Sequence, residues 1–223
     1  MCGIVGYIGH RNAYDVVING LKRLEYRGYD SAGIALYDGE ALKVCKTKGK
    51  VVHLEKKVQE SITSNGSIGI GHTRWATHGE PNDVNSHPHL SNSGNLAIIH
   101  NGIIENYDAL RKELKKRGYT FQSDTDTEVL VNLIEDVIKN EGVKLGKAVQ
   151  IALNQTVGAY AIAVFDKRKP DEIVVARLGS PLAIGIGDNE YFIASDASPF
   201  IAYTNNAIYL EDGEMAVVRQ GKE

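Results

Sequence analysis

Short strand-like segments joined by tight turns are the feature that most limits how this chain can fold. Turn-forming tetrapeptides at 37–40 (Tyr-Asp-Gly-Glu), 187–190 (Gly-Asp-Asn-Glu) and 211–214 (Glu-Asp-Gly-Glu) each connect two such segments. Connections this short predict hairpins, in which the two strands run antiparallel. The predicted strands cover residues 4–8, 33–37, 41–47, 68–73, 96–100, 159–165, 173–177, 182–186, 191–194, 207–210 and 215–219.

Segments with apolar residues at helical spacing cluster in the middle of the sequence. The strongest runs from Val129 to Ile138, and Thr125 with Glu128 forms a T-x-x-E capping box before it. The predicted helices cover residues 13–24, 51–62, 107–114, 129–138 and 145–153. These elements predict an α+β fold in which two antiparallel sheets pack together with helices outside them, a four-layer αββα sandwich.

The composition is that of an ordinary globular protein, with 43% hydrophobic and 24% charged residues among 223. No linker, repeat or low-complexity segment divides the chain, so we expect residues 1–223 to form one domain. The 25 basic and 28 acidic residues are scattered, and this pattern does not predict binding to nucleic acid.

The sequence predicts a cytoplasmic protein without a membrane partner. No apolar run approaches the ~18 residues of a membrane span, and the start Met-Cys-Gly-Ile-Val-Gly lacks the features of a signal peptide. Two cysteines, Cys2 and Cys45, are too few for a disulfide framework. Cys45 falls in a predicted strand, where we expect it to be inert.

Cys2 is the residue with the most chemical information. Removal of Met1 would leave Cys2 with a thiol and a free α-amine on one carbon, that is, a nucleophile and its base. An α-amine has a pKa near ~7.7–8.0, so part of it is unprotonated at neutral pH and can take the thiol proton. Taken alone, Cys2 is better explained as a residue that only follows the start codon and packs at the head of a strand.

A series of motifs carries a family resemblance over essentially the whole chain. In order, they read M-C-G-I-V-G-Y-I-G from residue 1, L-K-R-L-E-Y-R-G-Y-D-S-A-G at 21–33, G-H-T-R-W-A-T-H-G-E-P at 71–81, N-S-H-P-H at 85–89, H-N-G-I-I-E-N at 100–106 and S-D-T-D-T-E at 123–128. Together they resemble the glutaminase domains of glutamine–fructose-6-phosphate amidotransferases (isomerizing), also called glucosamine-6-phosphate synthases. These are class II, or N-terminal-nucleophile, glutamine amidotransferases, and the resemblance implies the N-terminal-nucleophile hydrolase fold.

The resemblance implies hydrolysis of L-glutamine to glutamate and ammonia through a thioester on Cys2, without a cofactor. Attack on the side-chain amide creates an oxyanion, and the matched positions for its hole are the Nδ2–H of Asn101 and the main-chain N–H of Gly102. We expect both at a sharp turn after the predicted strand 96–100. On its own, Asn-Gly is also an ordinary turn.

A glutamine site needs one fixed cation and one fixed anion, for the α-carboxylate and the α-ammonium. Arg74 ends the predicted strand 68–73 and has the planar fork that binds a carboxylate. Asp126 follows the predicted cap at the start of a helix, and the resemblance selects it for the ammonium. By spacing alone Asp126 is as well explained by helix capping, and Asp124 and Glu128 compete with it.

Further site residues come from the resemblance. It assigns Thr77 and His78 to contact with glutamine in a closing loop, and Trp75 to the ammonia route. Arg27 and Tyr29 match positions near the nucleophile and the glutamine site. The alternatives are that Trp75 is a core residue and that Arg27 is a surface cation or pairs with Asp30.

Three other functions fit parts of the sequence. His72, His78, His87 and His89 with Cys2 could form a zinc site, although their spacing matches no standard finger. A regulatory domain without catalysis is disfavoured because every residue that the chemistry needs is present. A third alternative is an N-terminal-nucleophile amidase for another amide, against which the pair Arg74 and Asp126 argues.

The family's synthases continue into a sugar-isomerase region that binds fructose 6-phosphate and receives the ammonia. This chain ends before that region, so we expect only the glutaminase half-reaction here, with transfer to fructose 6-phosphate in the full-length enzyme. We expect the full-length enzyme to be a homodimer and the isolated domain a monomer. If Met1 is retained, Cys2 has no free amine and the mechanism is blocked.

Overall fold

Two antiparallel sheets form the centre of the protein. The computed structural model describes residues 2–61, 65–75 and 82–221. The seven-stranded sheet has the order β11 (Ala207–Tyr209), β9 (Ala183–Ile186), β10 (Tyr191–Ala194), β1 (Gly3–Ile8), β4 (Ile68–Arg74), β2 (Ser31–Tyr37) and β3 (Leu42–Lys48). The five-stranded sheet has the order β12 (Met215–Arg219), β8 (Lys169–Leu178), β7 (Gly158–Asp166), β6 (Leu96–Ile104) and β5 (His89–Leu90). All strand pairs in both sheets are antiparallel.

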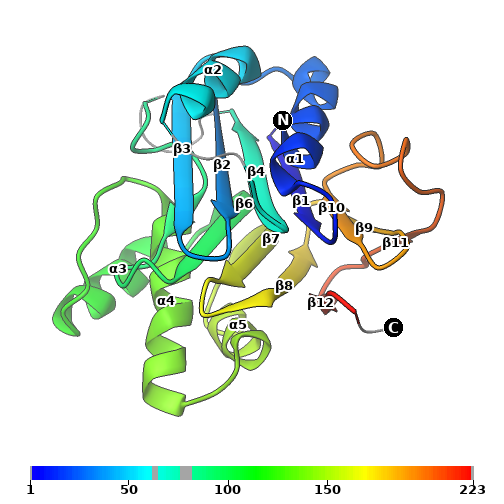
Figure 1. Ribbon diagram of the computed structural model, residues 1–223. Helices are drawn as coiled ribbons and strands as arrows, with labels where there is room; N and C mark the ends of the chain where they lie inside the picture. Colours follow the sequence, from blue (N-terminus) through cyan, green and yellow to red (C-terminus); the bar gives the residue numbers. More distant parts are fainter. Residues whose placement is uncertain (1, 62–64, 76–81, 222–223) are drawn as a thin grey trace.

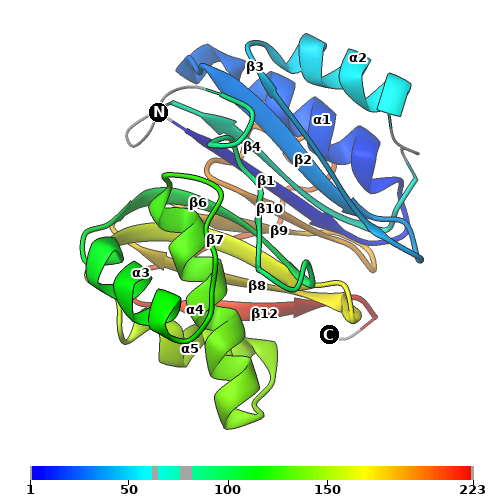
Figure 2. The same ribbon diagram turned by 90° about the vertical axis from the view of Figure 1, so that its left-hand side faces the viewer.

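Helices cover the outer face of each sheet, as Figures 1 and 2 show. The seven-stranded sheet carries α1 (Ala13–Arg23) and α2 (Val51–Ser61), and the short 3₁₀ helix η1 (Glu25–Arg27) follows α1. The five-stranded sheet carries α4 (Asp126–Glu141) and α5 (Leu145–Leu153), with α3 (Tyr107–Lys116) beside α4. The predicted four-layer αββα sandwich is therefore confirmed.

Three apolar cores hold the layers together. One lies between α1, α2 and the seven-stranded sheet, and another between the five-stranded sheet and its helices. The third lies between the two sheets and includes Ile4, Ile70, Ile99 and Phe165, all fully buried. Each such side chain contributes about 1.5–3 kcal/mol by leaving water. Within the described ranges, each helix is too short or too polar to cross a membrane.

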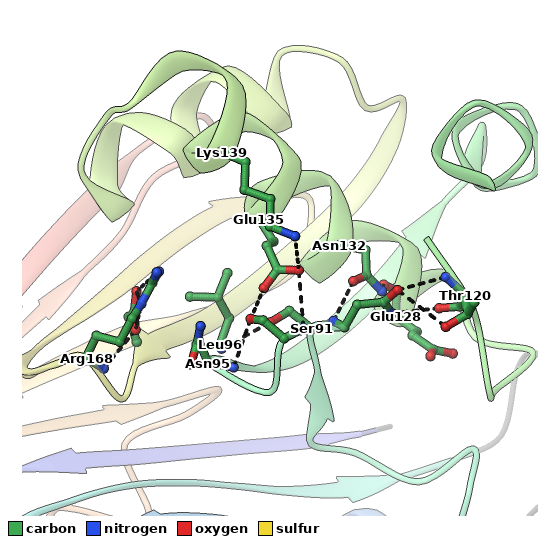
Figure 3. Close-up of polar contacts among 12 residues, drawn as sticks. Ser91, Asn95, Leu96, Thr120, Glu128, Asn132, Glu135, Lys139 and Arg168 are labelled. Atoms are coloured by element: carbon green, nitrogen blue, oxygen red, sulfur yellow. Dashed lines mark hydrogen bonds and ion pairs between the residues drawn. The ribbon is translucent and has the colours of Figure 1, made fainter. Parts of the chain in front are cut away.

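Helix α4 is unusual because it is buried from Asp126 to Val137 without interruption. Polar side chains on one face of α4 bind the connection between β5 and β6, as Figure 3 shows. Asn132 Oδ1 accepts the N–H of Asn92 (2.8 Å), and Glu135 accepts hydrogen bonds from Ser93. Because these contacts fix α4 against the five-stranded sheet, they also fix the residues at its first turn.

Of the three predicted hairpins, two are correct and one is wrong. The predicted hairpins at 37–40 and 187–190 are present as β2–β3 and β9–β10. The third prediction, a hairpin across 211–214, is wrong because β11 pairs with β9 and β12 pairs with β8 in the other sheet. The turn is real, since Glu214 N–H donates to Glu211 O (3.1 Å), but the chain changes sheet there.

Candidate active site

Cys2 and Arg74 lie side by side at one end of the seven-stranded sheet. Gly3 pairs with Thr73 across β1 and β4, so Cys2 directly precedes β1 where Arg74 ends β4. The Cys2 thiol contacts the main chain of Trp75, which donates its N–H to Sγ (3.1 Å) and accepts from Sγ (3.5 Å). The Trp75 side chain is 55% exposed and is therefore not a core residue.

The thiol of Cys2 needs help to ionise. Burial raises its pKa above the ordinary value, although the hydrogen bond from the Trp75 main chain and the charge of Arg74 act in the opposite direction. A thiol is a weak nucleophile until its proton is removed. The geometry therefore suits a mechanism in which a nearby base accepts this proton.

Asn101 and Gly102 come from the five-stranded sheet and reach Cys2 across the boundary between the sheets. Asn101 Nδ2 donates to the main-chain oxygen of Cys2 (3.1 Å). The predicted turn after residue 100 is wrong, because both residues lie within β6, paired with Ala161 and Tyr160 of β7. Gly102 has φ +119°, and a Cβ there would lie 2.2 Å from Ala159 O, so only glycine fits this position.

Asp126 is the first residue of α4, and Thr125 is its N-cap, as predicted. Thr125 Oγ1 accepts the N–H of Glu128 (3.3 Å). One oxygen of Asp126 accepts the N–H of Ile104 at the end of β6 (2.8 Å). The start of α4 favours a negative charge at this position, so the carboxylate is held in place by the helix and the sheet together.

A pocket of about 210 Å³ brings Cys2, Arg74, Gly102 and Asp126 together, whereas Asn101 is not among the residues that line it. Its lining consists of Cys2, His72, Arg74, Trp75, His87, His100, Gly102, Ile103, Thr125, Asp126 and Thr127. The pocket thus combines a thiol, a buried guanidinium and a buried carboxylate. A larger hollow of about 820 Å³ is lined by other residues, among them Lys46, Asp83 and Ser91, and by none of the predicted site residues that the structure describes.

Arg27 and Tyr29 have different positions relative to this pocket. Arg27 donates to the main-chain oxygen of Cys2 (3.1 Å) and forms an ion pair with Asp196 (2.9 Å). Tyr29 does not line the pocket; its hydroxyl donates to Glu25 and accepts the N–H of Val51 (2.9 Å) at the start of α2. Thr77 and His78 lie outside the described residues.

Four buried histidines lie next to one another at this site, and three of them, His72, His87 and His100, line the pocket. The rings of His72 and His87 are 4.3 Å apart, and those of His87 and His89 are 4.8 Å apart. Burial lowers the pKa of His72 to about 3 and lowers the pKa of His87, His89 and His100 as well, which keeps all four neutral at pH 7.

Three of the four histidines that suggested a zinc site are engaged in hydrogen bonds, and the fourth, His78, lies outside the described residues. The Nε2 atoms of His72, His87 and His89 lie 2.8, 2.8 and 3.1 Å from Asn101 Oδ1, Thr127 Oγ1 and Thr125 Oγ1. Among the described residues, no group of three or more His, Cys, Asp or Glu side chains is arranged to hold a metal ion. The cluster instead buttresses β6 and the start of α4.

Sequence reasoning missed several residues of the site. Thr127 joins His87 and His100 (2.8 and 2.9 Å), and Ser195 receives hydrogen bonds from Arg27 (3.0 Å) and the Ile4 N–H (3.1 Å). No spacing in a single sequence links Ser195 to this site, because Ser195 reaches Ile4 and Arg27 through the pairing of β1 with β10.

Comparisons with known proteins agree with this geometry. The model of the glutamine amidotransferase domain family matches residues 45–217. The glutamine–fructose-6-phosphate aminotransferases (isomerizing) of Bacteroides thetaiotaomicron and Chlorobaculum tepidum are 61% and 58% identical, over 100% and 98% of this chain. The chain spans only 36% of the length of each of these relatives.

A solved structure has the same fold. The glutamine phosphoribosylpyrophosphate amidotransferase of B. subtilis is 32% identical with a TM-score of 0.80, over 98% of this chain and 47% of that one. The family match covers most of the chain, and the fold of this amidotransferase extends over nearly all of it. The chain therefore belongs to the glutamine amidotransferase family.

Proposed function

We propose that this chain hydrolyses L-glutamine to glutamate and ammonia through a thioester on Cys2. The observation that carries the proposal is the single pocket lined by Cys2, Arg74, Gly102 and Asp126. Glutamine presents an amide, an α-carboxylate and an α-ammonium, and these residues offer a nucleophile, a cation and an anion that complement them. The names of the relatives, which act on glutamine, support the same substrate.

The reaction follows from the chemistry of these groups. After removal of Met1, the α-amine of Cys2 accepts the thiol proton, and the thiolate attacks the side-chain amide carbon of glutamine. Asn101 Nδ2–H and the Gly102 N–H stabilise the oxyanion that forms. The protonated amine returns its proton to the leaving nitrogen as the C–N bond breaks, which releases ammonia. Water then hydrolyses the thioester to glutamate and restores the thiol.

The proposal also covers the longer protein in which this half-reaction takes place. Residues 1–223 act as a glutaminase domain, and in longer relatives the ammonia passes to fructose 6-phosphate for amino-sugar synthesis. The full-length protein is a homodimer, whereas the domain alone is a monomer, and the reaction needs no cofactor. Cys2 and Cys45 are both free thiols, which fits the reducing cytoplasm.

The test uses the glutamine-mimicking diazoketone diazo-oxo-norleucine on protein without Met1. We expect one adduct on Cys2 by intact mass and peptide mapping, loss of the adduct in excess glutamine, and ammonia release from glutamine by unlabelled protein. Cys45→Ser is the matched control and should label like the wild type, because Cys45 is buried in β3. An adduct on Cys45, or none at all, contradicts the proposal.

The role of the amine is tested separately. Protein that retains Met1 has an amide in place of the Cys2 amine, so it should fold normally but release no ammonia. Equal turnover by preparations with and without Met1 would show that another group takes the thiol proton.

A further inference from the structure

The contact between His72 and Asn101 joins the two sheets at the reacting centre. His72 lies on β4 and is 1% exposed, and its Nε2 is 2.8 Å from Oδ1 of Asn101 on β6. The same Asn101 side chain donates through Nδ2 to the main-chain oxygen of Cys2 (3.1 Å). The Asn101 amide is thus held at both of its ends.

The two contacts determine where the protons lie. A main-chain oxygen can only accept, so the Asn101 amide must direct an N–H to Cys2 O and its oxygen to His72. That oxygen is also only an acceptor, so His72 must be protonated on Nε2. Burial lowers the pKa of His72 to about 3, so the ring is neutral and its Nδ1 carries no proton at pH 7.

The orientation of this amide matters for catalysis. Asn101 Nδ2 has two N–H groups, and the contact with Cys2 O uses one of them. The second remains for an oxyanion at Cys2. If the amide rotated by half a turn, it would present an oxygen lone pair to the oxyanion and would repel the charge. His72 opposes this rotation because its Nε2–H would then face an NH₂ group.

We propose that His72 is a positioning residue that fixes the orientation of the Asn101 amide and so completes the oxyanion hole. This inference rests on the proposed hydrolysis of glutamine.

The other buried histidines do not have this property. His87 and His100 contact Thr127 Oγ1, and His89 contacts Thr125 Oγ1. The Nε2 of His100 also faces the main-chain oxygen of Ala159 (3.4 Å), which can only accept. A hydroxyl presents the same oxygen whichever way it turns, so these histidines do not fix the orientation of an amide. Within the described part of the chain, His72 is the member of this cluster whose side-chain partner is an amide with two distinct ends.

The experiment is a double-mutant cycle between His72 and Asn101, measured as glutamine hydrolysis on Met1-free protein. His72→Leu should lower kcat by about 10- to 100-fold, less than loss of Asn101 itself, and should leave KM nearly unchanged. His72→Gln keeps an N–H donor near the Nε2 position and should recover most of kcat. In an Asn101→Ala background, His72→Leu should have no further effect.

His89→Leu is the matched control, because it removes an equally buried ring that does not touch Asn101. Its fold-change should be the same with Asn101 present or absent. Additive effects of His72→Leu and Asn101→Ala would overturn the positioning role, as would a rise in KM with kcat unchanged. Either result would make His72 a packing residue.

Nitrogen-15 NMR of the wild-type protein tests the proposal without a variant and without turnover. Protonated Nε2 and bare Nδ1 on His72, with one set of Asn101 side-chain amide signals, support it. The opposite tautomer overturns it. If the wild type released no ammonia from glutamine, the proposed function would fail, and this NMR result would still decide how Asn101 is held.

Discussion

The two sheets contribute different chemistry to the pocket. The seven-stranded sheet supplies Cys2 and Arg74 from the ends of adjacent strands. The five-stranded sheet and its helix supply Asn101 and Gly102 from within β6 and Asp126 from the start of α4. The proposed nucleophile and its neighbouring cation thus face the proposed oxyanion donors and the anion across the boundary between the sheets. The site is complete only when the two halves of the sandwich pack in register.

Acid should destabilise the packing between the two sheets, and we expect this to be the largest of the predicted effects. His72 comes from one sheet, His89 and His100 from the other, and the pKa of each is lowered by burial, as is that of His87. The unfolded chain therefore binds protons below about pH 6.5 that the folded protein does not. Each group therefore lowers the stability as the pH falls below about 6.5, by at most about 1.4 kcal/mol per pH unit for each proton that only the unfolded chain binds.

Denaturant unfolding at a series of pH values measures this slope. His89→Gln should flatten the slope by about one proton. A slope that begins only below about pH 4.5, where carboxylates titrate, would contradict the prediction.

Cys2→Ala removes the reacting atom from the seven-stranded side and should abolish ammonia release from glutamine. The change should leave thermal unfolding nearly unchanged, because Cys2 lies before β1 and is partly exposed. A coupled ammonia assay with a circular dichroism melt separates these outcomes. Turnover at more than a trace would mean that Cys2 is not the nucleophile.

Asn101→Ala tests the five-stranded side. Loss of one oxyanion donor costs about 10²- to 10³-fold in kcat, and KM for glutamine should change little because the contact matters in the transition state. Steady-state kinetics distinguish the two constants. Asn95→Ala, one residue before β6, is the control and should have wild-type kinetics. A variant that raised KM alone would assign Asn101 to substrate binding.

The fold class could be predicted from turns and helix caps, because each of these is determined by residues that are close together in the sequence. The turn at 37–40 joins strands of one sheet, and Thr125 caps α4 as expected. The second half of the predicted capping box differs: the Glu128 carboxylate accepts the N–H groups of Gln122 (2.9 Å) and Ser123 (2.7 Å). Local spacing predicted where this helix starts, but tertiary contacts decided the partners of its side chains.

The pairing of strands that are far apart in the chain could not be predicted from the sequence. The residues at 211–214 make a turn but do not determine that the next strand joins β8 rather than β11. The strand β5 has only two residues, too few to show alternation. Gly33 shows the same limit, because a Cβ there would lie 2.0 Å from His87 O, a contact that depends on how the 82–88 segment crosses β2.

The candidate site was predicted by family resemblance more than by spacing. Resemblance selected Asp126 over Asp124 and Glu128, and Asp126 is the one of the three that lines the pocket with Cys2. The partners of Arg27 were not predictable, since Ser195 and Asp196 lie about 170 positions away along the chain. Residues that support a site through such distant contacts leave no recognisable pattern in the sequence around the site.

The smallest predicted effect is on KM for glutamine. It compares Arg74 on the seven-stranded side of the boundary with Asp126 on the five-stranded side. Arg74→Lys keeps the charge but loses the fork, and Asp126→Asn removes the charge. Each should raise KM for glutamine by about 10- to 100-fold, as expected for one charge-assisted hydrogen bond of about 1.5–3 kcal/mol. Arg168→Lys and Asp166→Asn make the same two changes at the β7–β8 turn, away from the pocket, and should not change KM.

Two truncated substrates assign each charge to its partner. Glutaramate is glutamine without the ammonium group, and 4-aminobutanamide is glutamine without the carboxylate. Asp126→Asn should lose the preference for glutamine over glutaramate but keep that over 4-aminobutanamide, because only the ammonium contact is removed. Arg74→Lys should show the reverse. If either variant weakened both preferences equally, the two residues would act on the shape of the pocket, and the division of charge between the sheets would be wrong.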